Sequence, residues 1–106
     1  KSVKYNAEFS DNRISLFSAQ WGKCAVTGKY FQCTGDIHCH HKVPKARGGT
    51  DKYDNLVLVL PQVHRLIHAA DSGTIEKYMR LLNLDKAQTA KLNKYRAKAN
   101  NQPIKA

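Results

Sequence analysis

All five histidines of this chain lie between positions 38 and 68, in two groups. The first group is His38-Cys39-His40-His41, and the second is the pair His64 and His68, four residues apart. Side chains at positions i and i+4 share one face of a helix. Two sheltered imidazoles on a helix, opposite a third from a neighbouring strand, can bind a divalent metal ion. The spacing therefore indicates a metal site, although a His-x3-His pair alone is more often an ordinary polar pair on a short helix.

Two strands and a helix are expected to position these histidines. The predicted order is strand, loop, strand and helix, at residues 37–43, 45–54, 55–60 and 61–70. Pro44 ends the first strand because proline has no N–H for pairing, and Pro61 suits the first turn of the helix. The second strand is apolar on both faces and should be buried. On an ideal strand His40 and His41 point to opposite faces, so both serve one site only where the strand ends or kinks.

Further elements are predicted on both sides of this unit. Residues 1–10 are expected to be extended, and Asp11-Asn12 to cap a short helix. The expected buried side of that helix is Ile14, Leu16, Phe17 and Trp21. A strand over residues 24–28 would return over residues 29–34. Thr74 is expected to cap a later helix, and Asp85 to start a last one that runs to about Ala99.

The positive charge of the chain is unevenly distributed. Its 106 residues carry a formal net charge of +10, with a pI near 9.7. Residues 1–50 and 69–106 each hold eight Lys or Arg against three Asp or Glu, whereas residues 51–68 are neutral. Such an excess suits a polyanionic partner, either nucleic acid or an anionic membrane surface. Basic segments around a neutral, histidine-bearing centre fit a nuclease better than a uniformly basic packaging protein.

The apolar pattern and the cysteines limit the cellular setting. The longest apolar run, residues 56–60, is far shorter than the roughly 20 residues of a membrane-spanning helix. No segment resembles a signal peptide. Three cysteines do not form a disulfide framework, which predicts a reducing compartment and hence a cytoplasmic protein without a membrane partner. The chain begins with Lys1, as a piece of a longer protein would.

The order of these features resembles the HNH endonucleases. Four separated elements carry the resemblance: His40-His41-Lys42-Val43-Pro44, Gly48-Gly49-Thr50-Asp51, Asn55-Leu56, and His64 with His68. The resemblance implies a ββα-metal fold, in which a hairpin with a long loop and one helix hold a divalent ion. Over about residues 11–82 the sequence is most similar to the C-terminal endonuclease domain of group II intron-encoded reverse transcriptase/maturases. The segments Cys24-Ala-Val-Thr-Gly28, 38–42, 55–57 and 64–68 carry that closer similarity.

The resemblance also assigns a role to each site residue. His41 resembles the general base that deprotonates the attacking water. Asn55 resembles the middle residue of the motif, which would hold His41 in position; otherwise it is a turn residue between loop and strand. His40, His64 and His68 resemble the ligands of one divalent metal ion, with Mg²⁺ ranked before Mn²⁺, Ni²⁺ or Zn²⁺. That ion would bind the scissile phosphate and stabilise the departing oxygen, leaving 5′-phosphate and 3′-hydroxyl ends.

Several polar residues near these positions could touch DNA. Lys45, Arg47 and Arg65 are expected to contact DNA phosphates, and the alternative is an ordinary solvated surface. His38 shares a strand face with His40 and could orient a ligand or touch phosphate, but such a histidine more often does neither.

One departure from the family concerns a structural zinc ion. Many HNH domains hold such an ion with two Cys-x2-Cys pairs. The matching positions here are Cys24, Thr27, Leu60 and Val63. With one ligand left, Leu60 and Val63 should pack as core, and the cysteines should be buried free thiols. A zinc site made of the three cysteines and a histidine is the less regular alternative.

The sequence thus predicts an α+β protein with an HNH ββα-metal core and flanking helices. We expect one domain over residues 1–106, with its core at about 22–70 and a helical C-terminal extension at about 74–99. The predicted function is metal-dependent cleavage of DNA within a group II intron-encoded protein, with intron RNA as a further partner through the larger parent protein. In that setting the cut strand would supply a 3′-hydroxyl for reverse transcription. The alternatives are a catalytically inactive HNH-like DNA-binding module and a zinc-dependent structural module.

Overall fold

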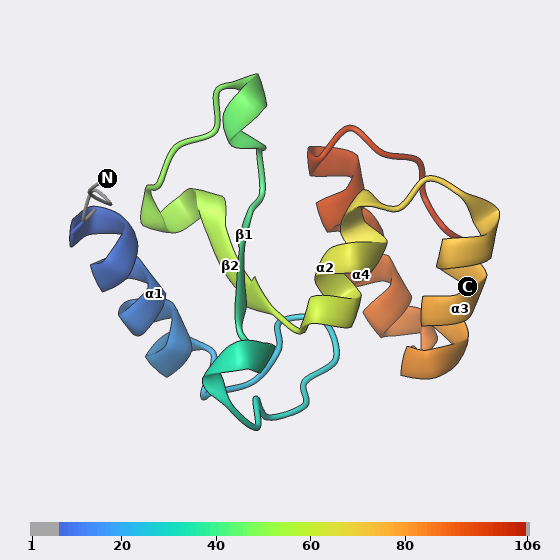
Figure 1. Ribbon diagram of the computed structural model, residues 1–106, viewed down its shortest axis with the longest axis horizontal. Helices are drawn as coiled ribbons and strands as arrows, with labels where there is room; N and C mark the ends of the chain where they lie inside the picture. Colours follow the sequence, from blue (N-terminus) through green and yellow to red (C-terminus); the bar gives the residue numbers. More distant parts are fainter. Residues whose placement is uncertain (1–6, 106) are drawn as a thin grey trace, which may run out of the picture.

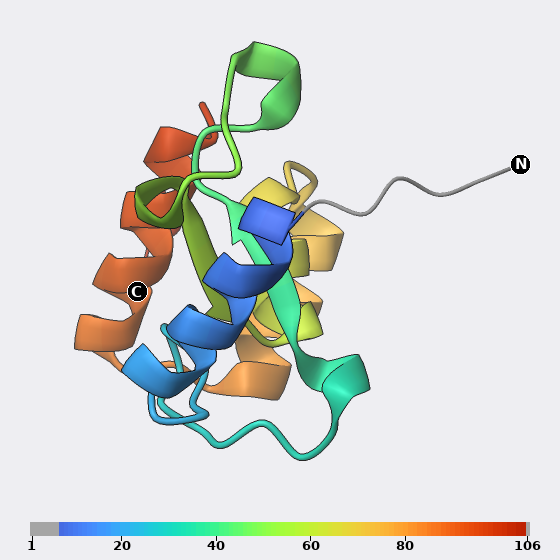
Figure 2. The ribbon, with the colours of Figure 1, turned by 90° about the vertical axis from the view of Figure 1, so that its left-hand side faces the viewer.

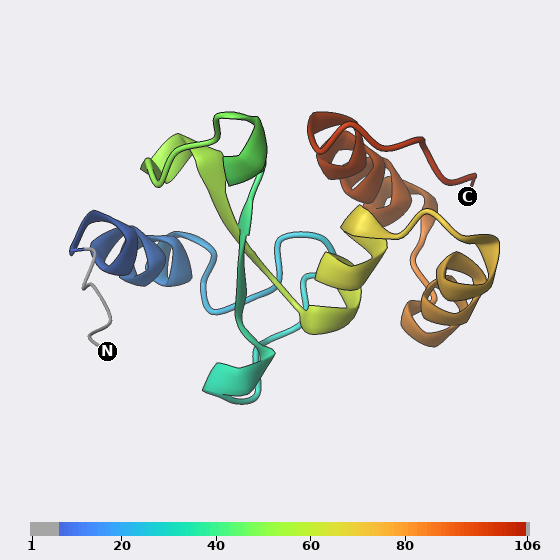
Figure 3. The ribbon, with the colours of Figure 1, turned by 45° about the horizontal axis from the view of Figure 1, so that its top comes forward.

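The computed structural model describes residues 7–105, in which a two-stranded sheet lies between helices (Figure 1). Strands β1 (His38–His41) and β2 (Leu56–Val59) are antiparallel, with His38 opposite Val59 and His41 opposite Leu56. Helix α1 lies on one side of the sheet, and α2, α3 and α4 lie on the other, as two further views confirm (Figures 2 and 3). The bounds of the helices are Ala7–Ala19, Pro61–His68, Ser72–Leu82 and Lys86–Lys98.

Strand β2 lies between two apolar cores. All four of its residues are buried, as its uninterrupted apolar sequence predicts. Val57 and Val59 pack with residues of α2 and with Leu92 of α4, whereas Leu56 and Leu58 pack against Leu16 of α1. Because β1 is paired with β2, this alternation also determines on which face of the sheet each side chain of β1 lies.

The predicted strand–loop–strand–helix order is confirmed, with shorter strands than expected. The connection between β1 and β2 contains two short 3-10 helices, η2 (Lys45–Arg47) and η3 (Tyr53–Asn55), and projects beyond the end of the hairpin (Figure 1). Helix α2 begins with Pro61, as expected. Gly49 lies so close to the backbone of the chain entering this loop that an added Cβ would stand 1.8 Å from the carbonyl oxygen of Val43. The glycine therefore allows the loop to close.

The prediction for the first helix is wrong in both its start and its buried side. Residues 1–6 lie outside the described residues, but 7–10 are already helical, so Asp11-Asn12 is inside α1. Asn12 instead donates a hydrogen bond from Nδ2 to the carbonyl oxygen of Asp51 (2.8 Å), which ties α1 to the β1–β2 loop. Of the four residues expected to be buried, only Leu16 is; Ile14, Phe17 and Trp21 are exposed. The two-stranded sheet is too narrow to cover more of the helix.

The hairpin predicted over residues 24–34 is also wrong. The segment is a turn closed by one isolated bridge between Lys23 and Tyr30. Its backbone is used elsewhere: the Ala25 N–H donates to the carbonyl oxygen of Leu58 (3.1 Å), at the outer edge of β2. The side chain of Gln20 contacts the same residue, accepting from its N–H and donating to its carbonyl oxygen. These contacts satisfy the sheet edge without a third strand.

The two C-terminal helices start at acidic caps. Asp71, rather than the expected Thr74, caps α3: its carboxylate accepts the Thr74 N–H at 2.9 Å. Asp85 caps α4 as predicted, in a reciprocal capping box with Gln88. None of the helices within residues 7–105 has the length and apolar character needed to cross a membrane.

Candidate metal centre and catalytic histidine

The register of the sheet sorts the four consecutive residues of β1 onto two faces. His38 and His40 pair with Val59 and Val57 and so face α2, whereas Cys39 and His41 face α1. The sequence alone indicated that adjacent histidines would diverge, and they do. Within residues 7–105 the sheet has two strands, so one edge of β1 is unpaired.

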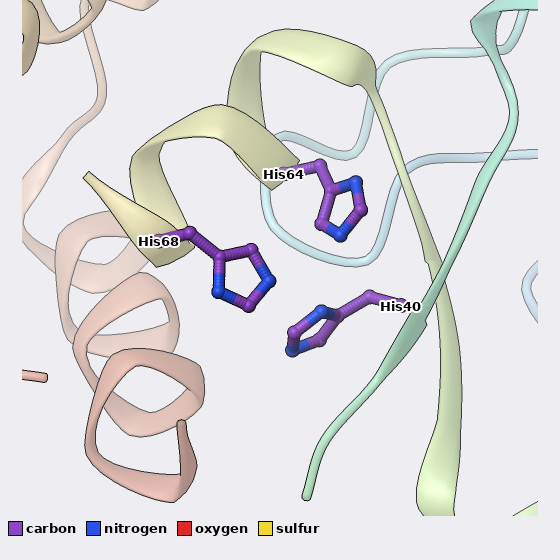
Figure 4. Close-up of side chains that lie close together, drawn as sticks. All are labelled: His40, His64 and His68. Atoms are coloured by element: carbon purple, nitrogen blue, oxygen red, sulfur yellow. The ribbon is translucent and has the colours of Figure 1, made fainter. Parts of the chain in front are cut away.

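On the α2 face, the three histidines expected to bind metal meet. His64 and His68, one turn apart on α2, approach His40 from β1, and their rings converge (Figure 4). Each pair of ring centroids is 5.1–5.2 Å apart, and one nitrogen of each ring lies within 4.8 Å of the others. Nitrogens that share one ion at about 2.1 Å lie at most about 4.2 Å apart, so the cluster is close to the spacing of a metal site. His68 is exposed, which leaves the cluster open on one side.

The protonation of the cluster also suits a metal ion. Burial, reinforced by the charges of His64 and His68, lowers the pKa of His40 from 6.5 to about 3. Burial and the charge of His68 lower the pKa of His64 to about 4, and burial lowers the pKa of His68. All three rings are thus neutral at pH 7, the form that coordinates metal. His40 Nε2 is buried without a hydrogen-bond partner among residues 7–105, so this nitrogen lacks the polar contact that a buried ring nitrogen usually has.

His38 contacts one of the histidines of the cluster, which is the geometry of the less favoured expectation that it orients a ligand. Its Nδ1 lies 3.0 Å from Nδ1 of His64, within hydrogen-bonding distance, with the two rings roughly perpendicular. If His64 is the donor, its Nε2 keeps a lone pair for a metal ion. A ligating histidine commonly donates its other N–H to such a partner, which fixes the ring's tautomer and orientation. The alternation of β1, which puts His38 and His40 on one face, was the available signal.

On the opposite face, His41 is held by two contacts. Its Nε2 lies 2.8 Å from Asp51 Oδ1, and its ring stacks on Phe9 of α1, with centroids 5.7 Å apart and an interplanar angle of 3°. The hydrogen bond from His41 and the approach of Lys45 lower the pKa of Asp51, so this carboxylate is ionised at neutral pH. Asp51 was part of the Gly-Gly-Thr-Asp motif, but sequence reasoning gave it no role.

Asn55 closes the long loop through its backbone contacts. Its Oδ1 accepts the Val43 N–H at 2.9 Å, and its Nδ2 donates to the carbonyl oxygens of Val43 (3.1 Å) and Thr50 (2.9 Å). These bonds join the segment after His41 to the residue before Asp51. These side-chain hydrogen bonds of Asn55 all go to backbone atoms, so the effect of Asn55 on His41 passes through the loop.

The three basic residues expected to contact DNA are all exposed. Lys45 and Arg47 lie on η2 in the β1–β2 loop, and Lys45 Nζ approaches Asp51 Oδ2 at 3.3 Å. Arg65 lies on α2 between His64 and His68, with its guanidinium 5.8 Å from the ring centre of Tyr78. Their contact with DNA stays a prediction.

The cysteines form no part of a metal cluster within residues 7–105. Cys24 is buried and accepts the Leu60 N–H on its sulfur at 3.4 Å, while Val63 packs in the same core. The expectation that all three thiols are buried is wrong: Cys33 is exposed on a turn and Cys39 is only partly covered. Apolar packing therefore occupies the positions that the family resemblance implied for a structural zinc ion.

In a comparison with protein-family models, residues 24–70 match the model described as HNH endonuclease. The matched segment contains β1, β2 and α2 and every residue expected at the site. The mixed fold, with its small antiparallel sheet and four helices within residues 7–105, agrees with the ββα-metal architecture predicted for the chain. The searches of curated proteins and of solved structures gave no significant match.

Proposed function

We propose that this chain, which carries an HNH endonuclease domain at residues 24–70, is a metal-dependent nuclease that hydrolyses phosphodiester bonds of DNA. The observation that carries the proposal is the meeting of three neutral imidazoles, from His40, His64 and His68, beside the free edge of a strand that ends in His41. DNA as the partner is supported by the family match and by the net charge of +10.

In this proposal His40, His64 and His68 hold one divalent ion. When bound, that ion would neutralise charge on the scissile phosphate and on the departing oxygen. A donor set of three imidazoles suits a transition-metal ion such as Mn²⁺, Ni²⁺ or Zn²⁺ better than Mg²⁺, which prefers oxygen ligands. We therefore rank the transition metals before Mg²⁺, the reverse of the order that the family resemblance gave.

His41 is proposed as the general base. It takes a proton from the attacking water, whose oxygen forms a bond to phosphorus while the bond from phosphorus to the 3′-oxygen breaks. The departing 3′-oxygen takes up a proton and the products carry 5′-phosphate and 3′-hydroxyl ends. His38 and Asn55 act indirectly, His38 through its contact with His64 and Asn55 through the loop that it closes. Lys45, Arg47 and Arg65 would position the DNA backbone.

The group II intron setting is the finer part of the proposal. It rests on the sequence similarity of residues 11–82 alone, and with it the supply of a 3′-hydroxyl for reverse transcription and a parent protein that binds intron RNA. The cytoplasmic location is proposed from the three cysteines, whose odd number suits a reducing compartment.

One observation favours a second candidate, an inactive HNH-like DNA-binding module. His41 and His40 lie on opposite faces of the sheet, so one phosphate must reach both across the edge of β1. The two candidates separate when the pure protein is incubated with supercoiled plasmid and Mg²⁺, Mn²⁺, Ni²⁺ or Zn²⁺, with a chelator as control. A nuclease nicks the plasmid only with metal. Binding of the plasmid without cleavage in every metal would favour the inactive module.

A further inference from the structure

The contacts of His41 suggest what holds its ring and which of its nitrogens is the base. We propose that Asp51 is the positioning residue of His41: its carboxylate accepts the Nε2–H, so that Nδ1 keeps the lone pair that receives the proton of the attacking water. This inference rests on the proposed nuclease function, which gives His41 its role as base.

The hydrogen bond itself defines the tautomer. An ionised carboxylate only accepts hydrogen bonds, so across the 2.8 Å between Asp51 Oδ1 and His41 Nε2 the proton must belong to the ring. A neutral imidazole carries one N–H, and if that N–H is at Nε2 then Nδ1 is the acceptor. Both side chains are mostly covered, with exposed fractions of 20% for His41 and 12% for Asp51, so water competes weakly for the contact.

Asp51 is itself fixed from several sides. Its carbonyl oxygen accepts a hydrogen bond from Asn12 of α1, and its second carboxylate oxygen lies 3.3 Å from Lys45 Nζ. The preceding residue, Thr50, is held through its carbonyl oxygen by Asn55. The backbone of Asp51 is therefore tied to α1, its carboxylate contacts the start of the loop, and the preceding residue is tied to the end of the loop.

The ring of His41 has little freedom left. Phe9 stacks on one face with nearly parallel planes, which fixes the plane of the ring but not which edge points to Asp51. A 180° rotation of the ring about its Cβ–Cγ bond would keep the plane but put a ring carbon in place of Nε2 beside the carboxylate, which would break the hydrogen bond. Phe9 and Asp51 together thus select one orientation, in which Nδ1 is free of both contacts.

Asp51 keeps its contact with the ring through the proton transfer. When Nδ1 takes the proton, Nε2 still carries its hydrogen 2.8 Å from Asp51 Oδ1, so the hydrogen bond is retained. The pairing of a base histidine with a carboxylate on its other nitrogen is a general arrangement for such transfers.

The test compares Asp51→Ala and Asp51→Asn with a matched control, Asp54→Ala, which removes an exposed carboxylate from the same loop. We expect Asp51→Ala to lower kcat of plasmid nicking by about 10–100-fold with KM and metal affinity unchanged. Asp51→Asn, whose amide oxygen can still accept the Nε2–H, should lose less, and Asp54→Ala should behave as the wild type. Circular dichroism verifies that each variant is folded.

Two measurements separate positioning from a merely structural role. Long-range ¹H–¹⁵N spectra of the neutral ring should report the Nε2–H tautomer of His41 in the wild type and a mixture in Asp51→Ala. In addition, Asp51→Ala should cost nothing further in a His41→Ala background, because it acts through that ring. An unchanged His41 spectrum, or equal losses in both backgrounds, would overturn the proposal. A wild type that never cleaves would instead contradict the nuclease function, while the tautomer spectrum would still test Asp51.

Discussion

His40 and His41 are adjacent on β1, yet their rings lie on opposite faces of the sheet, one in the imidazole cluster with α2 and the other between Phe9 and Asp51. This separation assigns them different partners and therefore different expected phenotypes. The ring of His40 is buried, so it can act only on something inside the cluster. The ring of His41 is partly exposed near the free edge of the strand, where a DNA backbone can approach.

The first prediction concerns metal stoichiometry. Titration calorimetry with Mn²⁺ or Ni²⁺ should find one ion per chain, and His64→Ala or His68→Ala should abolish tight binding, because each removes one of three ligands. His41→Ala is the matched control, a histidine of the same hairpin outside the cluster, and should bind normally. Unchanged affinity in both α2 variants would disprove the proposed ligand set.

A second prediction concerns His38. His38→Ala should weaken metal binding by about 10-fold or more without changing the stoichiometry, because His64 would lose the partner of its Nδ1. His38→Gln, whose side-chain oxygen can accept the same bond, should recover part of the affinity. If His38→Ala binds metal as tightly as the wild type, the contact between the two rings has no role in the site.

A third prediction concerns the stability of the metal-free protein at acidic pH. The pKa values of His40 and His64 are about 3 and about 4 in the fold, against about 6.5 in an unfolded chain. The unfolded state therefore binds more protons between these values, so the neutral rings contribute their full stability above about pH 6.5 and lose it as the pH falls toward 4. Urea unfolding between pH 7.5 and 4.5 should show this decline.

The control for that experiment is His64→Gln, which removes one of the two strongly shifted groups. Its free energy of unfolding should depend less steeply on pH over the same range. If the wild type is equally stable at pH 7 and pH 4.5, the burial of neutral imidazoles is not a feature of the folded protein.

A fourth prediction concerns Arg96, a buried residue of α4. Its guanidinium donates to the carbonyl oxygens of Leu66, Ala69 and Gln102, and so satisfies the C-terminal end of α2, which carries two proposed metal ligands. Arg96→Ala should lower the free energy of unfolding by at least about 2 kcal/mol, because the carbonyls would be left buried without partners. The exposed Lys98→Ala should have little effect. Equal stability of the two variants in urea would refute this role.

The position of Arg96 also explains why the basic C-terminal segment cannot be treated as one DNA-binding surface. By sequence, Arg96 is one more cation on a Lys-rich helix, but it is 2% exposed and therefore cannot reach a phosphate. Removing α4 would expose the core around Leu92 as well, so a truncation would test folding rather than DNA contact.

The histidine cluster could be predicted because its signal is local. His64 and His68 are four residues apart on a helix that begins at Pro61. The buried apolar residues of β2 indicate a paired strand beside it, and the histidines before the loop place the third ring on that strand. Asp51 and Phe9 could not be predicted in the same way. Their contacts with His41 depend on the packing of α1 and on the path of the β1–β2 loop, neither of which has a period in the sequence.

The predictions for the flanking helices were wrong for a related reason. Asp11-Asn12 has the residue types of a helix cap, but both residues lie inside α1. The side chain of Asn12 makes a tertiary hydrogen bond to Asp51 instead of capping the helix. Thr74 also suits a cap, yet Asp71 lies three residues earlier and its carboxylate takes the same backbone N–H. The contact of Asn12 is a tertiary one that local propensity does not encode, whereas Asp71 and Thr74 both suit a cap and propensity alone does not decide between them.

The central claim is that His41 is the base and His40 a metal ligand, and the most direct test is plasmid cleavage by His41→Ala and His40→Ala with metal binding measured on the same samples. We expect His41→Ala to bind one ion and the plasmid but to cleave about 10²–10⁴-fold more slowly, and His40→Ala to lose metal and cleavage together. Cleavage by His41→Ala at the wild-type rate, or loss of the ion in His41→Ala with its retention in His40→Ala, would contradict it.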